Sequence, residues 1–215
     1  GLLRTLLWFN PLVDAATSES DFDLRDLRKR RMSVYIAVTP DDLARVQPIL
    51  NLFFQQLLDV NTKVLPQDDP ALKYKCMLLM DEFTSIGKIQ ILSKGISYIA
   101  GYNLRMLPII QSPAQVREVY GHDAAETFID NHALHIIYTP KNIKVAKEIS
   151  ETLGNQTWKV KSLSKAVGFS KGNKSENTSD QRRALMLPQE LIGMSQEREI
   201  LLYEGTPPIE CKKIR

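Results

Sequence analysis

The sequence predicts an α/β fold with a mostly parallel sheet that carries helices on both faces. Two apolar runs, residues 76–80 and residues 104–110, each end in polar side chains, and the segment between them has a helical periodicity of apolar residues. Strand, helix and strand in this order form the repeating unit of a doubly wound sheet, whose crossovers are almost always right-handed. The chain should therefore contain at least one pair of neighbouring parallel strands.

The first apolar run leads directly into two carboxylates, Asp81 and Glu82. A parallel strand covered on both faces reads as a continuous apolar run, and ligands of open α/β sheets bind beyond the carboxyl ends of the strands. We therefore expect residues 76–80 to be buried on both faces, with the acids at the ligand crevice. The second run ends at Gln111, which should lie at the same rim.

The segment between the two strands should form one crossover helix. Its apolar residues recur at steps of three and four, which is the spacing of an amphipathic helix. They are Ile86, Ile89, Leu92, Ile96 and Ile99.

Patterns elsewhere predict further elements. Before the first run we expect a strand at residues 32–38 and a helix over about residues 43–57, which Pro48 either kinks or starts. After Gln111 we expect one or two short helices split near Gly121. The remaining expected elements are a strand at 133–138, a helix at 143–153 closed by Gly154, a strand at 158–163, a loop at 164–181, a strand at 183–187, a helix at 188–194 and an antiparallel edge hairpin of strands 199–203 and 209–214.

Adjacent carboxylates at a strand tip suit the chemistry of a hard cation. Mg²⁺ is usually held by one or two carboxylates together with substrate phosphates and water. Asp81 could order the metal through its water shell, and Glu82 could polarise an attacking water, as in the Walker B motif of nucleoside triphosphatases. From these residues alone, an ordinary strand end with two solvated acids is the alternative interpretation.

One expected motif is missing from the sequence. A complete P-loop enzyme needs a Gly-x-x-x-x-Gly-Lys-Ser/Thr segment to hold phosphates, and no segment matches it. Gly87 and Lys88 are followed by Ile89 instead of a hydroxyl residue. The chain therefore carries half of an ATP site.

Composition sets broader limits. With 215 residues and a hydrophobic fraction of 43%, the chain is long enough for one globular α/β domain with a small appendage. The net charge of +3 permits a nucleic-acid partner without requiring one. Two cysteines far apart in the sequence predict reduced thiols and a cytosolic setting. No apolar stretch reaches the roughly 18 residues that span a bilayer, so an anchor would lie outside this sequence.

Two further groups of residues are candidates for a metal site and for a nucleic-acid site. The histidines His122, His132 and His135 lack a recognisable set of companion ligands, which argues against a metal site. Residues 158–183 hold seven basic residues against two acids, with Trp158 and Phe169 among them. Such a segment could follow a phosphate backbone, or it could be a solvated loop kept soluble by its lysines.

Several segments, taken in order, closely resemble the TraG-like coupling proteins of conjugation and type IV secretion. The resemblance covers nearly the whole chain. Its most specific stretches are residues 17–27, 34–43, 52–56, 79–83, 109–112, 202–209 and 212–215.

The resemblance implies a RecA-like ATPase that forms a hexamer around a central channel. Such proteins are anchored in the bacterial inner membrane by amino-terminal helices, face the cytoplasm, and recruit DNA-relaxase complexes or effector proteins for delivery to the secretion machine. In this family the Walker A loop precedes an inserted helical domain. Residues 1–14 would then be the end of that insertion or a connector, and residues 15–215 the carboxyl-terminal portion of the nucleotide-binding domain, itself expected to be soluble.

The family motif also implies roles for individual residues. By position, Asp81 and Glu82 match Walker B, with ATP and Mg²⁺ as ligands, and Gln111 resembles the sensor of the γ-phosphate. Some relatives carry an arginine in the helix after Walker B that reaches a neighbouring subunit's nucleotide. The corresponding region here, residues 98–101, has none, which leaves Arg105 as the nearest substitute.

Two other functions remain open at this stage. One is a FtsK- or HerA-like translocase of duplex DNA, which the order of the motifs disfavours. The other is a non-catalytic docking module that presents a surface to secretion substrates or to other components of the machine. In either case the chain alone is expected to hydrolyse nothing, because it lacks Walker A.

Overall fold

The computed structural model describes residue 15, residues 18–164 and residues 175–214. The chain divides into two compact units, residues 1–131 (unit 1) and residues 132–215 (unit 2), which are described separately. The predicted boundary after residue 14 lies outside the described residues.

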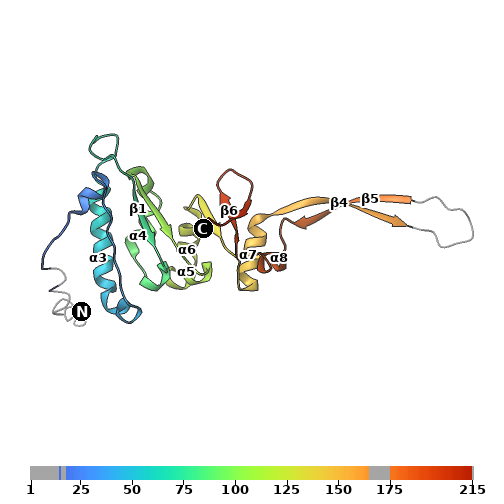
Figure 1. The fold of residues 1–215 in the computed structure, drawn as a ribbon, viewed down its shortest axis with the longest axis horizontal. Coiled ribbons are helices and arrows are strands. Elements are labelled where there is room, and N and C mark those ends of the chain that lie inside the picture. Colours follow the sequence, from blue (N-terminus) through green and yellow to red (C-terminus); the bar gives the residue numbers. More distant parts are fainter. Residues whose placement is uncertain (1–14, 16–17, 165–174, 215) are drawn as a thin grey trace, which may run out of the picture. The chain divides into compact units, whose positions relative to one another are not determined.

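Unit 1 is built on a pair of parallel strands, β1 (Cys76–Met80) and β2 (Leu104–Pro108) (Figure 1). Their register pairs Cys76 with Leu104 and Met80 with Pro108, so the two strands end level with each other. This confirms the predicted parallel neighbours. The other elements of unit 1 are η1 (Leu24–Arg28), η2 (Pro40–Asp42), α3 (Leu43–Asn61), η3 (Phe83–Ile86), α4 (Gln90–Gly95), η4 (Ile99–Tyr102), α5 (Pro113–Tyr120) and α6 (His122–Asp130).

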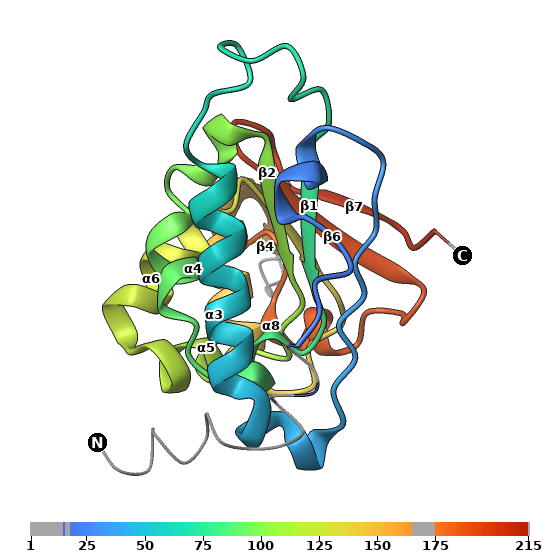
Figure 2. The ribbon, with the colours of Figure 1, turned by 90° about the vertical axis from the view of Figure 1, so that its left-hand side faces the viewer.

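Helices α3 to α6 lie on one face of the β1–β2 pair (Figure 2). On that face Leu78 and Met80 are 8% and 4% exposed, whereas Met77 and Leu79 on the other face are 61% and 63% exposed. The prediction that β1 is buried on both faces is therefore wrong for the described structure. The apolar run is real, but among the described residues helices pack against only one face of the strand.

The crossover between β1 and β2 is not one helix, as predicted, but the three short pieces η3, α4 and η4. Gly87 interrupts the helical path with φ of +77°, and a Cβ there would lie 2.1 Å from Nε2 of Gln47 on α3. The apolar stripe is nevertheless buried, because Ile89, Leu92 and Ile99 are at most 2% exposed. The periodicity therefore predicted the buried face correctly, but the prediction of one continuous helix is wrong.

The segment before α3 also differs from the prediction. Residues 32–38 form neither a helix nor a strand in the described structure, so the predicted strand is wrong there. Met32 and Val34 pack against the core of unit 1, while Tyr35 is 90% exposed. Helix α3 is present as predicted and continues through Pro48 to Asn61.

Arg28, at the end of η1, is a buried cation in unit 1, with 2% of its surface exposed. Its guanidinium donates to Oδ1 of Asn61 (3.2 Å) and to the carbonyl oxygens of Val64 (3.3 Å) and Tyr102 (3.0 Å). Burial lowers the pKa of Arg28 from its ordinary value. The side chain thereby ties η1 to the end of α3 and to η4.

Unit 2 contains an antiparallel sheet in the order β3 (Leu134–Ile137), β6 (Arg198–Tyr203), β7 (Ile209–Lys212). The hairpin predicted at the carboxyl end is confirmed, with β7 at one edge of the sheet. Helices α7 (Ile143–Leu153) and α8 (Pro188–Ile192) form as predicted. Asn142 caps α7 by accepting a hydrogen bond from the Lys144 N–H (2.8 Å), and Gly154 closes the helix with φ of +79°.

A second antiparallel pair in unit 2 joins β4 (Asn155–Ser164) to β5 (Ser175–Ala184), drawn in Figure 1 as a two-stranded ribbon. The predicted strand at 158–163 is confirmed and is longer than expected. The predicted loop at 164–181 is wrong for residues 175–181, which pair with β4, while residues 165–174 lie outside the described residues. The strand predicted at 183–187 ends at Ala184. Pairing with β4 overrides the weak strand propensity of this polar sequence.

Candidate functional site

The carboxyl ends of β1 and β2 are joined by backbone hydrogen bonds. The Ile109 N–H donates to the Met80 carbonyl oxygen (2.9 Å), and the Phe83 N–H donates to the Ile109 carbonyl oxygen (3.0 Å). Asp81 and Glu82 lie between these bonded positions, and Gln111 follows two residues after Ile109. The backbone therefore brings the three predicted site residues to one rim of the sheet.

The two acids are exposed, and the backbone at Glu82 is unusual. Glu82 adopts φ of 46° and ψ of 46°, the left-handed region, which costs a non-glycine residue about 1–2 kcal/mol. Oδ1 of Asp81 accepts a hydrogen bond from the Glu82 N–H (3.1 Å), and the Glu82 carbonyl oxygen accepts one from the Ser85 N–H (2.8 Å). These contacts turn the chain sharply at the strand tip and hold it there.

A short chain of side-chain hydrogen bonds joins the acidic loop to Gln111. Thr84 Oγ1 donates to Oε1 of Gln115 (3.4 Å), and Nε2 of Gln115 donates to Oε1 of Gln111 (3.4 Å). Thr84 and Gln115 were not predicted as part of the site. Gln115 could have been proposed, because it lies in the first turn of the helix that Pro113 opens directly after Gln111.

Behind the rim, Phe83 is completely buried in a stack of three aromatic rings. Its ring centroid lies 5.5 Å from that of Tyr120 on α5 and 5.0 Å from that of Phe128 on α6, with interplanar angles of 8° and 3°. The Tyr120 hydroxyl oxygen also accepts a hydrogen bond from the Ile89 N–H (3.3 Å). Burial raises the pKa of Tyr120, so the phenol stays neutral at physiological pH.

The donor set at the rim fits Mg²⁺. Exposed carboxylates are ligands that Mg²⁺ prefers, and the ion commonly keeps several waters and takes its other oxygens from phosphates. In the described part of the chain, no group of three or more histidine, cysteine or acidic side chains is arranged to hold a metal ion. A metal at this rim would therefore depend on Asp81, Glu82, water and a phosphate ligand together.

Arg105, the candidate trans arginine, lies near the amino end of β2 and therefore at the other end of the strand from the rim. Its Nη1 donates to the carbonyl oxygens of Ala100 (2.7 Å) and Leu104 (3.0 Å). Both cysteines are free, and Cys76 is buried in β1.

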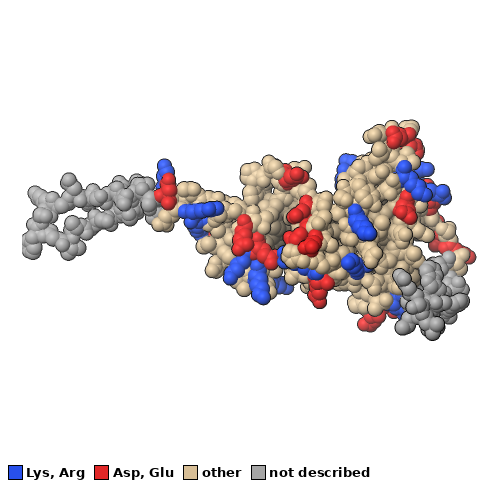
Figure 3. Space-filling view, turned by 180° about the vertical axis from the view of Figure 1, so that it is seen from behind, with Lys and Arg blue, Asp and Glu red and all other residues tan. Residues whose placement is uncertain are grey.

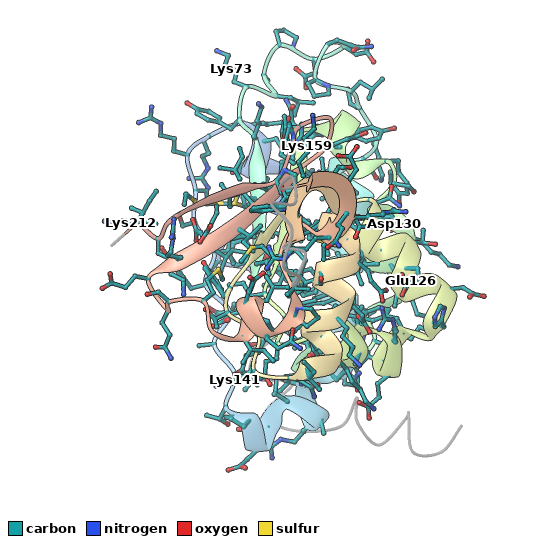
Figure 4. All side chains as sticks on the ribbon, turned by 90° about the vertical axis from the view of Figure 1, so that its right-hand side faces the viewer. Lys73, Glu126, Asp130, Lys141, Lys159 and Lys212 are labelled. Carbon is teal, nitrogen blue, oxygen red and sulfur yellow. The ribbon has the colours of Figure 1, made fainter. Side chains whose placement is uncertain are left out.

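Among the residues that Figure 3 draws in colour, charged side chains of both signs are interspersed. On α6, Glu126 (labelled in Figure 4 together with Asp130) accepts a hydrogen bond from Nε of Arg117 on α5 at 2.8 Å. This ion pair lowers the pKa of Glu126 and links the two helices. On the β4–β5 ribbon, Arg183 lies over the exposed ring of Trp158, 5.7 Å from its centroid, and also pairs with Glu190.

Residues 3–215 match the sequence profile of the family described as Type IV secretory system Conjugative DNA transfer. The chain belongs to this family. That result confirms the resemblance to TraG-like coupling proteins.

Curated relatives within this family match most of the chain. Protein VirD4 of Agrobacterium fabrum is 34% identical over 212 residues, which cover 97% of this chain and 31% of VirD4. Conjugal transfer protein TraG of Escherichia coli is 28% identical over 200 residues, which cover 87% of this chain and 31% of TraG. The chain thus spans about a third of the length of these relatives.

Solved structures confirm the fold class. The coupling protein TrwB, solved in an unbound form, matches with a TM-score of 0.72 at 17% identity, over 90% of this chain and 44% of that chain. TrwB has also been solved in complex with ADP and Mg²⁺, and that structure matches with a TM-score of 0.69 at 16% identity, over 90% and 43% of the two chains. No helix among the described residues of this family member is long and apolar enough to cross a membrane.

Proposed function

We propose that this chain is the carboxyl-terminal portion of the nucleotide-binding domain of a type IV coupling ATPase, with residues 1–14 as the end of an inserted helical domain or a connector. One observation carries the proposal. In a chain of the conjugative DNA transfer family, the backbone hydrogen bonds between β1 and β2 bring Asp81, Glu82 and Gln111 to one rim. The solved complex of TrwB with ADP and Mg²⁺ supports a nucleotide as the ligand of this fold.

Each rim residue has a proposed role in ATP hydrolysis. Asp81 would hold Mg²⁺, largely through its water shell, and Glu82 would orient and polarise the attacking water. When bound, the ion would neutralise charge on the phosphates. Charge neutralisation and positioning together account for most of the rate gain in phosphoryl transfer. Gln111 would contact the γ-phosphate and sense its loss. The phosphate-binding loop would have to come from sequence outside residues 1–215.

The whole protein would act as an oligomer. We propose a hexamer at the cytoplasmic face of a bacterial inner membrane, hydrolysing ATP at its subunit interfaces. Its partners would be DNA-relaxase complexes or protein effectors and other components of the type IV secretion system. The family description and the name of the relative TraG, a conjugal transfer protein, support this class of partners, and DNA binding is proposed from the family.

The direct test is Glu82→Gln in the full-length protein. This change keeps the size of the side chain and removes the charge that would activate water, so we expect ATP turnover to fall by at least about 100-fold. The affinity for a fluorescent ATP analogue should change by less than about twofold, because a residue can act in turnover without contributing to nucleotide binding. Steady-state phosphate release and equilibrium titration measure the two quantities.

Glu118→Gln is the matched control, because Glu118 is an exposed glutamate of α5 in the same unit. It should leave both turnover and nucleotide binding unchanged. Full turnover in Glu82→Gln would remove Glu82 from the mechanism and favour the docking-module alternative.

A further inference from the structure

One side chain, Tyr120, contacts both ends of the loop that follows Glu82. Its ring stacks on Phe83 at the start of the loop, and its hydroxyl oxygen accepts a hydrogen bond from the Ile89 N–H at the end of the loop. All three residues are at most 3% exposed. The Ile89 N–H lies beside a buried phenol, so loss of that hydroxyl would leave a buried donor without this acceptor.

The position of this loop determines where the Glu82 carboxylate points. Glu82 occupies a left-handed conformation that an unconstrained glutamate rarely adopts. Phe83, the next residue, is fixed by complete burial and by the hydrogen bond from its N–H to the Ile109 carbonyl oxygen. A conformation of this kind persists only when its surroundings over-determine it. The aromatic stack supplies part of that constraint.

Helix α5 is joined to the same loop at both of its ends. Near its start, Gln115 contacts Thr84 and Gln111, and at its last residue Tyr120 contacts Phe83 and Ile89. The helix begins two residues after Gln111. A shift of Gln111 would therefore move an element that also contacts the loop behind Glu82.

We propose that Tyr120 is a positioning residue for Glu82, and that α5 transmits movement of Gln111 to the acidic loop through Tyr120. This inference rests on the proposed ATPase function. It extends that function by placing the coupling between the sensor residue and the acidic loop in α5. Tyr120 is buried behind the rim and would act through Phe83 and Ile89.

Tyr120→Phe in the full-length protein tests the inference, because it keeps the ring in the stack and removes only the hydroxyl. We expect kcat for ATP to fall about fivefold to tenfold, the usual consequence of losing one buried hydrogen bond that matters in the transition state. KM for ATP should change by less than about twofold. Hydrogen exchange measured by mass spectrometry should become faster in the peptide that covers residues 83–89.

Ile99→Val is the matched structural control. Ile99 is 2% exposed in the same core, and the change removes one buried methylene. It should lower thermal stability while leaving kcat and the exchange of residues 83–89 unchanged. This separates positioning of the loop from a general loss of core packing.

The outcomes distinguish the two proposals. Slower turnover and faster loop exchange in Tyr120→Phe, but not in Ile99→Val, would support a positioning role. Wild-type kcat in Tyr120→Phe, or an equal fall in Ile99→Val, would overturn that role while Glu82→Gln still tests the ATPase function by itself. Wild-type turnover in Glu82→Gln would overturn the ATPase mechanism, and the role of Tyr120 with it.

Discussion

Unit 1 and unit 2 differ in the chemical composition of their buried clusters. Unit 1 encloses three stacked aromatic rings and the guanidinium of Arg28, which is 2% exposed. The buried cluster of unit 2, in the described part of the chain, consists of aliphatic and thioether side chains. These are Ala146, Leu153, Leu191, Met194 and Ile200.

Hydrogen bonds connect the elements of unit 2 around this cluster. The Glu190 carboxylate accepts from the Leu187 N–H (2.8 Å) at the start of α8, and the Ser150 hydroxyl donates to the Met186 carbonyl oxygen (2.6 Å). A buried aromatic stack can help to hold a backbone conformation that is unfavourable in isolation, as at Glu82. The candidate site lies in the unit whose interior can constrain it.

The largest expected effect is the loss of the buried cation of unit 1. Arg28→Ala should reduce the free energy of unfolding by about 3–5 kcal/mol, because Oδ1 of Asn61 and the carbonyl oxygens of Val64 and Tyr102 would lose their shared donor. Arg30→Ala is the control, since Arg30 is exposed and pairs with Asp26 on the surface, and it should cost less than about 1 kcal/mol. Urea unfolding measures both free energies of unfolding. Equal losses would mean that the hydrogen bonds of Arg28 do not stabilise unit 1.

The next effect compares the two faces of β1. Leu78→Ala should cost about 2–5 kcal/mol, because it leaves a cavity in the covered face, where Leu78 is 8% exposed. Leu79→Ala removes the same atoms from a side chain that is 63% exposed and should cost less than about 1 kcal/mol. Thermal unfolding followed by circular dichroism would show the difference, and comparable losses would mean that the second face is also packed.

The smallest expected effect on stability is the loss of the Glu190 carboxylate in unit 2. The Leu187 N–H and the Arg183 guanidinium both favour the charged form of Glu190 and lower its pKa below the ordinary value of 4.5. Because the folded pKa is depressed, Glu190 stabilises the fold above its unfolded pKa, and this contribution is lost as pH falls through the folded pKa. Glu190→Gln should therefore be slightly less stable than the wild type at neutral pH and equal to it in acid. A pH series of unfolding midpoints tests the direction, and a gap that persists in acid would rule out this carboxylate as its cause.

Much of unit 1 could be predicted because its signals are local. Apolar runs with polar tips located β1 and β2, Gly121 divided α5 from α6, and strand ends identified Asp81, Glu82 and Gln111 as site candidates. The roles of these three residues stay predictions. The break at Gly87 was missed because it involves Gln47 of α3, which lies forty positions earlier in the chain. Periodicity reports a buried face and contains no information about such a contact.

The remaining errors also have non-local causes. Strand β5 has a polar sequence, and its structure follows from its register with β4 rather than from propensity. Tyr120 and Phe83 are separated by α4 and β2 in the sequence, so their stacking could not be inferred from spacing. The second face of β1 was expected to be covered because its residues are apolar, but composition does not determine which elements pack against a strand.

The left-handed backbone of Glu82 implies a conflict between folding and chemistry at one position. Glycine would adopt this conformation without a steric penalty, so Glu82→Gly would relieve about 1–2 kcal/mol of strain, offset in part by the extra freedom of glycine in the unfolded chain. A carboxylate here is retained against the preference of its own main chain. Selection for thermal robustness alone would be expected to drift away from glutamate at this site, whereas selection for turnover would restore it.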